Sequence, residues 1–137
     1  MPNKLIVRYQ KFAPLFLRLG LAAVFFLFGL QKLINPSQTT AEIQLLVNFE
    51  LAEAAALNFY LGLTEILIAF AFFFGFKVRL FSLAASFLLA MFFLSFLVKY
   101  GLSINPDLYR DIGLLGASAA LFLLGAGPWS LDNQTKN

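Results

Sequence analysis

The strongest constraint on this chain is a long run of apolar residues that no charge interrupts. Residues 80–98 read LFSLAASFLLAMFFLSFLV and contain no Asp, Glu, Lys or Arg. A membrane-spanning helix needs about 20 predominantly apolar residues, a length that this run meets. Segments 14–34, 57–76 and 107–126 are of similar length and character. We therefore predict an all-α chain that folds as a transmembrane four-helix bundle.

The overall composition agrees with a chain whose solvent is lipid. Hydrophobic residues make up 61% of the sequence and charged residues 12%, whereas a soluble domain is about a quarter charged. The 18 phenylalanines exceed what a small water-soluble core could bury. At 137 residues the chain is predicted to be a single domain, 1–137. The expected partner is the lipid bilayer. The net charge of +3 does not indicate nucleic-acid binding, because membrane proteins carry excess Lys and Arg in their cytoplasmic loops.

The sequence contains no cysteine and no histidine. Their absence excludes disulfides, thiol redox chemistry, cysteine- or histidine-based zinc sites and His-ligated haem. We expect no metal site and no intrinsic cofactor. Proton or electron chemistry would have to use carboxylates, Arg, Lys, Tyr or an external cofactor.

The distribution of loop charge predicts the orientation. Membrane proteins carry excess Lys and Arg in their cytoplasmic loops. Basic residues precede the first span and fill the turn after the second, whereas the loop 35–56 contains three Glu and no Lys or Arg. We expect a multi-pass protein of the cytoplasmic membrane, with both termini in the cytoplasm and the acidic loop outside.

The outer loop and the fourth span carry further local signals. Segment 41–56 has apolar residues at helical spacing, and Ser37, Thr39 or Thr40 could cap such a helix. This predicts a short amphipathic helix over the bundle mouth or in the interface, a connector rather than a functional lid. For the fourth helix, Asn105 is the expected cap, with Pro106 in the first turn.

Four charged residues within the predicted spans are candidates for a functional site: Arg18, Lys32, Glu65 and Asp111. A charge at a helix centre costs about 2.5–3.5 kcal/mol on insertion scales, so such residues usually face the bundle interior and pair. Glu65 lies near mid-depth and Lys32 and Asp111 in the outer half, whereas Arg18 lies in the inner half and competes with Lys32 for Glu65. We predict a polar seam from Arg18 through Glu65 to Lys32 and Asp111.

This cluster has two interpretations. Buried opposite charges can hold a proton or a ligand, or they can simply fix which helices pack together. For Glu65 the two interpretations are balanced. For Arg18, Lys32 and Asp111 the structural or interfacial one is favoured.

Small and aromatic residues are interpreted as packing elements. Gly29 would allow a close helix approach, and a packing face is expected at Gly113, Gly116, Ala117 and Ala120. The phenylalanines of the third span are expected to face lipid or fill the core. Trp129 is expected to be an interfacial anchor.

Several short motifs occur together in a characteristic order. RLGLAAVFFLFGLQKL contains Arg18 and the pair Gly29 and Lys32; Glu65 follows the outer loop, and Gly75 and Arg79 follow the glutamate. The chain closes with GAGPWSLD, which includes Gly127 and Asp132. In this order and spacing the chain resembles the DoxX family of small four-helix bacterial and archaeal membrane proteins. One departure is Ala69, where the family often has Gly.

The resemblance implies an integral protein of the cytoplasmic membrane. Some relatives are subunits of quinone-linked oxidoreductases, and others associate with redox-stress proteins. The first hypothesis is therefore a subunit or accessory of a quinone-linked redox system, with a quinone and a redox-enzyme subunit as expected partners. The second is a non-catalytic anchor or assembly bundle, or a small carrier of a lipid-like molecule. Catalytic activity and homo-oligomerisation are left open.

Overall fold

The computed structural model describes residues 4–47, 51–102 and 106–134, and this part of the chain is helical without strands. Its helices are α1 (Lys4–Gln10), α2 (Ala13–Ile34), α3 (Pro36–Val47), α4 (Leu51–Phe74), α5 (Val78–Tyr100), α6 (Pro106–Leu124) and α7 (Leu131–Gln134). The all-α prediction is confirmed.

Three helices among the described residues are long and apolar enough to cross a membrane. They are Ala13–Ile34, Glu53–Phe74 within α4, and Val78–Tyr100. The fourth predicted span corresponds to α6, which has 19 residues and is not among these three candidates. Its first six residues include Asp107, Arg110 and Asp111. The structure thus gives a multi-pass membrane protein, whereas a fourth span stays a prediction.

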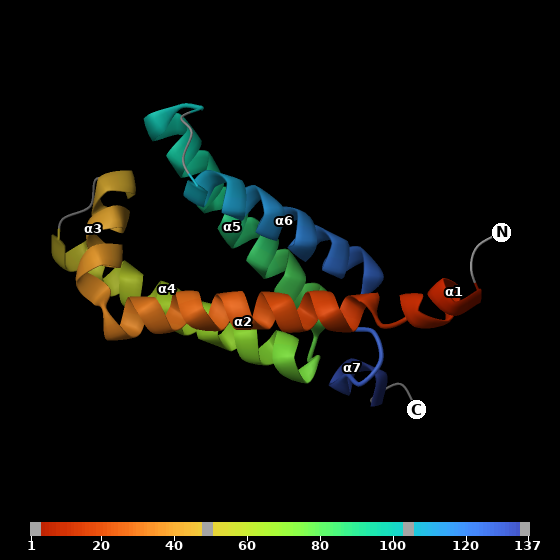
Figure 1. Ribbon diagram of the computed structural model, residues 1–137. Coiled ribbons are helices and arrows are strands. Elements are labelled where there is room, and N and C mark those ends of the chain that lie inside the picture. Colours follow the sequence, from red (N-terminus) through yellow and green to blue (C-terminus); the bar gives the residue numbers. More distant parts are fainter. Residues whose placement is uncertain (1–3, 48–50, 103–105, 135–137) are drawn as a thin grey trace.

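The long helices form two pairs. α2 packs mainly against α4, and α5 mainly against α6. Figure 1 shows that the two pairs lie close together at the end that carries α7 and diverge toward the end that carries α3. The candidate site described below lies at the α3 end.

The apolar core lies where the two pairs meet. Phe25 of α2 and Phe72 of α4 are fully buried, and their rings meet edge to face with centroids 6.1 Å apart. Leu121 of α6 and Val78 of α5 are also fully buried in this cluster. Each of the four long helices therefore contributes to one core.

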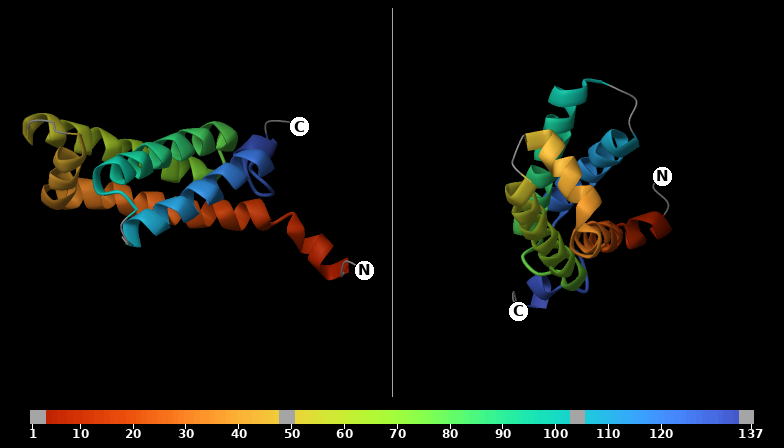
Figure 2. Two further views of the ribbon diagram at one scale, coloured as in Figure 1. Left: turned by 90° about the horizontal axis from the view of Figure 1, so that it is seen from above. Right: turned by 90° about the vertical axis from the view of Figure 1, so that its left-hand side faces the viewer.

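Both described ends of the chain lie at the same end of the molecule. In both views of Figure 2, α1 extends beyond the bundle and α7 folds back near the turn between α4 and α5. The location of both termini on one side of the membrane, and the side that they face, stay predictions.

Several local predictions need correction. α3 begins at Pro36, so Ser37, Thr39 and Thr40 lie inside the helix and do not cap it. The outer segment is not one helix over 41–56, because its last residues belong to α4, which starts at Leu51. Pro106 does open α6, and the expected cap Asn105 lies outside the described residues.

The predicted packing face of α6 is also wrong in part. Gly113 and Gly116 are exposed, and a Cβ added to either would meet nothing within 4 Å. Ala117 is half-buried and packs against the core. The helix is rotated so that Ser118 and Leu121, both fully buried, face the bundle.

Candidate functional site

The central feature of the candidate site is an ion pair between α2 and α4. Lys32 Nζ donates to both carboxylate oxygens of Glu65, at 2.9 Å each. The side chains are 13% and 3% exposed, so the pair is largely removed from solvent. Each charge is therefore compensated by the other.

Two glycines set the distance between the helices beside this pair. Gly29 and Gly62 each lie three residues before a member of the pair. A Cβ on Gly29 would lie 2.7 Å from Gly62 O and 2.6 Å from Ile66 Cγ1. Only a residue without a side chain allows this approach. Gly62, which the sequence interpretation did not single out, shares the spacing of Gly29 and could have been found by it.

Asn58 fixes the backbone at Lys32. It is 1% exposed, and its Nδ2 donates to Lys32 O at 3.0 Å. This carbonyl belongs to the last turn of α2, where helix carbonyls lack intrahelical partners. Sequence reasoning missed Asn58, since a single amide in an apolar run does not indicate its partner.

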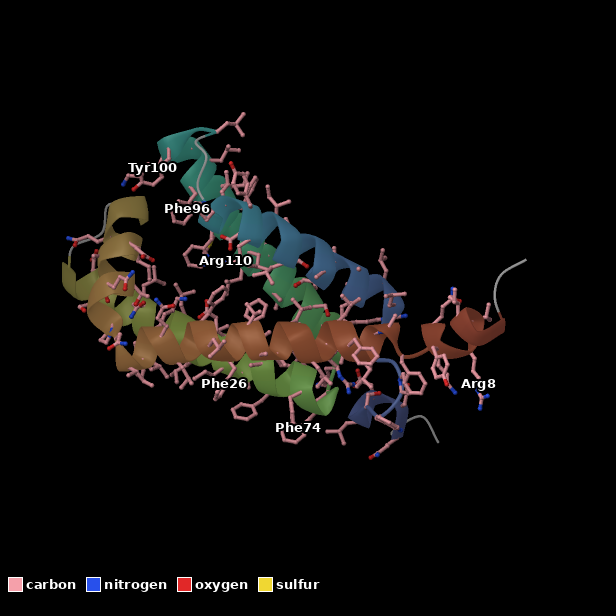
Figure 3. All side chains as sticks on the ribbon, in the orientation of Figure 1. Arg8, Phe26, Phe74, Phe96, Tyr100 and Arg110 are labelled. Carbon is pink, nitrogen blue, oxygen red and sulfur yellow. The ribbon has the colours of Figure 1, made fainter. Side chains whose placement is uncertain are left out.

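A cavity of about 190 Å³ opens beside the pair. Its walls come from α2 through α6 and comprise Phe25, Phe28, Gln31, Lys32, Gln38, Thr39, Glu42, Ile43, Glu65, Leu88, Leu89, Phe92, Phe96, Arg110 and Asp111. Figure 3 shows Arg110 and Phe96 on the side of α5 and α6 that faces α3. The cavity thus combines charged groups with aromatic walls.

Two cations of this cavity lie over the ring of Phe28. Arg110 Cζ lies 4.7 Å from the centroid of its ring and Lys32 Nζ 5.7 Å. Cations are attracted to the negative face of an aromatic ring. Arg110 Nε also pairs with Asp111 Oδ1 at 3.2 Å. Arg110 therefore belongs to the site, although the sequence interpretation did not include it.

Three of the four predicted charges meet at this cavity, but Arg18 does not. Arg18 and Lys32 are 14 residues apart in α2, roughly 21 Å along a helix that rises about 1.5 Å per residue. Glu65 lies at the level of Lys32, so the expected approach of Arg18 to Glu65 is not made. The predicted seam is corrected to a cluster of Lys32, Glu65, Asp111 and Arg110.

Arg18 instead binds the C-terminal segment at the α7 end. It is 1% exposed; Nη1 donates to Ala126 O at 3.1 Å and Nη2 to Trp129 O at 2.9 Å. We call the set of Arg18, Gly75, Ala126, Trp129 and Asp132 the Arg18 junction. A carbonyl partner in a distant loop gives no signal in the sequence around Arg18.

Most of the remaining motif residues lie in or next to the Arg18 junction. Gly75 has φ +71°, and any Cβ there would overlap Arg18 Nη1. Gly127 has φ +70° and lies against Pro14. Arg79 lies close to Gly125. These glycines adopt a conformation that L side chains rarely take.

Asp132 caps the start of α5 from 54 residues away in sequence. Its carboxylate accepts from Lys77 N at 2.6 Å and Val78 N at 2.8 Å, while its own N–H donates to Gly75 O at 3.0 Å. The first N–H groups of a helix lack intrahelical partners and favour a negative charge. The closing motif therefore holds the α4–α5 turn.

Trp129, which is 78% exposed, contacts Phe12.

The chain matches the model of a known protein family. The DoxX family matches residues 13–99, more than half of the chain, and the chain belongs to this family. Gly127 and Asp132 lie outside the matched range. Neither the curated proteins nor the solved structures contain a match to this chain.

Proposed function

We propose that this member of the DoxX family is a subunit or accessory of a quinone-linked membrane redox system, and that the cavity beside Lys32 and Glu65 takes the quinone headgroup. The observation that carries the proposal is a compensated charge pair inside two membrane-crossing helices that opens onto an aromatic-lined cavity. Ionisable residues within spans usually mark ligand or proton sites.

The donor set fits a ring that carries carbonyl oxygens. Lysine has three N–H donors, and two of them bind Glu65, which leaves one for a carbonyl oxygen. Phe28, Phe92 and Phe96 supply apolar walls. The cavity volume of about 190 Å³ is below the roughly 300–1,000 Å³ of sites for drug-sized ligands, so it suits a headgroup with its tail outside.

The residues of the chain would have separate roles. When bound, a quinone supplies the electron-accepting chemistry that no residue of the chain provides. Lys32 would orient a carbonyl oxygen and stabilise negative charge on it. Glu65 would hold or release a proton at a carboxylate oxygen. Asp111 would keep the guanidinium of Arg110 in place over Phe28.

A fourth span is part of the same proposal. α6 packs along α5 and returns the chain to the α7 end (Figure 1). Its 19 residues correspond to roughly 28 Å of a hydrocarbon core about 30 Å thick. Arg110 and Asp111 would then lie near the outer headgroups, with both termini in the cytoplasm.

The alternative is a non-catalytic bundle that anchors partners or carries a lipid-like molecule. A second hollow on the outer face of α2 and α4 favours it: this hollow measures about 430 Å³ and is lined only by apolar residues such as Ala22, Phe26 and Phe70. It could hold an acyl chain. It contains no group for proton or electron chemistry.

Quinone binding separates the two functions. Purified protein is incubated with a short-chain quinone, and native mass spectrometry counts bound ligand in wild type, Glu65→Gln and Glu53→Gln. Glu53 lies on the same helix and is exposed, so its variant is a matched control. We expect binding in wild type and Glu53→Gln and loss in Glu65→Gln. Failure of wild type to bind, or equal binding in all three proteins, would reject the quinone site.

A further inference from the structure

The cavity has its mouth at one end of the bundle. The polar residues around it come from the α3 end of their helices: Gln31 from the end of α2, Gln38 and Glu42 from α3, and Arg110 from the start of α6. All four are exposed to solvent. Figure 1 shows the helix pairs diverging at this end. A ligand or water molecule can therefore approach from the α3 side.

The floor of the cavity is apolar and tightly packed. Phe25, Leu88 and Leu89 line it, and Phe25 and Leu89 also belong to the core cluster that includes Phe72 and Leu121. Phe25, Phe72 and Leu121 have no exposed surface. Along α2, this cluster occupies the turns between Arg18 and Lys32. The core thus separates the cavity from the α7 end.

The Arg18 junction closes the α7 end beneath this core. Arg18 of α2 donates hydrogen bonds to the carbonyls of Ala126 and Trp129. Asp132 accepts hydrogen bonds from the α4–α5 turn and so holds the same segment there. Ala126 also packs into the core cluster. The segment after α6 therefore covers the base of the bundle.

Three buried hydroxyls in α5 and α6 are the polar groups that would favour an inner path through the described core. The hydroxyls of Ser82, Ser86 and Ser118 are buried, and none of them has a hydrogen-bond partner among the described residues. None of the three serines lines the cavity. A charged ligand or ion that crossed this region would lose its hydration, and no charged group there would compensate for the loss, so this route is strongly unfavourable.

We infer that the cavity exchanges ligand, water and protons with the α3 side of the membrane only, and that the α7 end is sealed by the core and the Arg18 junction. The inference concerns the route to the cavity, so it holds whether or not a quinone is the ligand. It gives the site a sidedness that neither the family membership nor the ion pair specifies.

The absence of cysteine makes the inference directly testable. Single cysteines are introduced in the full chain and treated with a charged, membrane-impermeant methanethiosulfonate, applied to intact cells or to inside-out vesicles. Leu88→Cys reports from the cavity, with Phe92→Cys as a second reporter. Gln38→Cys in α3 and Leu131→Cys in α7, both at exposed positions, identify the two sides. Ser82→Cys reports from the sealed half.

Each outcome is decisive for the route. We expect Leu88→Cys and Phe92→Cys to react from the side that labels Gln38→Cys and not from the side that labels Leu131→Cys. Ser82→Cys should react from neither side, while N-ethylmaleimide added after denaturation in SDS confirms a free thiol in every reporter. Reaction of the cavity reporters from the Leu131 side, or from neither side, overturns the inference.

The role of Arg18 in the seal has its own measurement. In an Arg18→Ala, Ser82→Cys variant the C-terminal segment loses two hydrogen bonds, and we expect Ser82→Cys to become reactive from the Leu131 side. Leu88→Cys in the same background should keep its sidedness if the core still separates the two halves. If Ser82→Cys stays unreactive in this background, Arg18 does not contribute to the seal. Quinone binding is not used in either measurement, so their failure is distinguishable from failure of the proposed function.

Discussion

Lys32 Nζ donates to both carboxylate oxygens of Glu65 at 2.9 Å, and the two residues come from helices that both cross the membrane. The pair joins α2 to α4 where Gly29 and Gly62 bring their backbones together. The cavity beside it is the candidate site. A purely structural role and a chemical role of this pair predict different results for the variants described next.

Removing one member of the pair should destabilise the protein far more than removing both. Lys32→Met leaves the Glu65 carboxylate buried and unpaired, which costs about 3–5 kcal/mol, whereas replacing both partners by apolar residues is often neutral. We therefore expect Lys32→Met to unfold at lower denaturant concentration and Lys32→Met, Glu65→Leu to recover much of the loss. Unfolding in detergent micelles measures this. Additive losses would show that the pair does not act as a unit.

Exchanging the two charges separates pairing from chemistry. Lys32→Glu, Glu65→Lys keeps one charge of each sign at the contact, so we expect it to fold. The quinone hypothesis predicts that it loses ligand binding, because the donor and the proton carrier have changed places. A folded exchange variant that binds like wild type would favour the purely structural role. Native mass spectrometry with a short-chain quinone provides the measurement.

The glycine contact predicts different effects for two glycines of the same helix. Gly29→Ala would place a Cβ 2.6 Å from Ile66 Cγ1, and such overpacking typically costs about 1–3 kcal/mol. Gly20→Ala meets nothing within 4 Å, and alanine is favoured over glycine within a helix by about 1 kcal/mol. We expect opposite shifts of the unfolding midpoint. Equal shifts would contradict the close approach of α2 and α4.

Structural features that depend on neighbouring residues can be predicted from this sequence, whereas contacts between residues far apart in the chain are harder to predict. Apolar runs predict the helices, because a membrane-spanning helix needs a certain length and hydropathy, and both can be read from one continuous stretch of sequence. Depth in the membrane alone does not rank Arg18 and Lys32 as partners of Glu65, whereas the Gly29–Gly62 contact places Lys32 beside Glu65. The partners of Arg18 are backbone carbonyls of the segment after α6, and a carbonyl has no residue type to detect.

The closing motif predicts a capping effect at long range. Asp132 accepts from the first N–H groups of α5, and losing a helix cap costs about 0.5–2 kcal/mol. Asp132→Ala should lower the free energy of unfolding by this amount, while Gln134→Ala, an exposed position in the same short helix, should not. Unfolding in micelles compares the two variants. A matching loss in Gln134→Ala would show a general effect of α7 and no specific cap.

The orientation proposal predicts that both termini are cytoplasmic. Epitope tags at the N-terminus and the C-terminus should both resist protease in intact cells and both be cleaved in inside-out vesicles. If α6 does not span, the tags will lie on opposite sides, and one will be cleaved in intact cells. The assay therefore also tests the fourth span.

A binding measurement at the Lys32–Glu65 cavity tests directly whether this cavity holds a quinone. Native mass spectrometry of wild type, Glu65→Gln and the exposed control Glu53→Gln, each with the same short-chain quinone, compares proteins that differ at one carboxylate. We expect a bound quinone in wild type and in Glu53→Gln and none in Glu65→Gln. A wild-type protein without quinone, or a Glu65→Gln protein that retains it, would show that the cavity is not a quinone site.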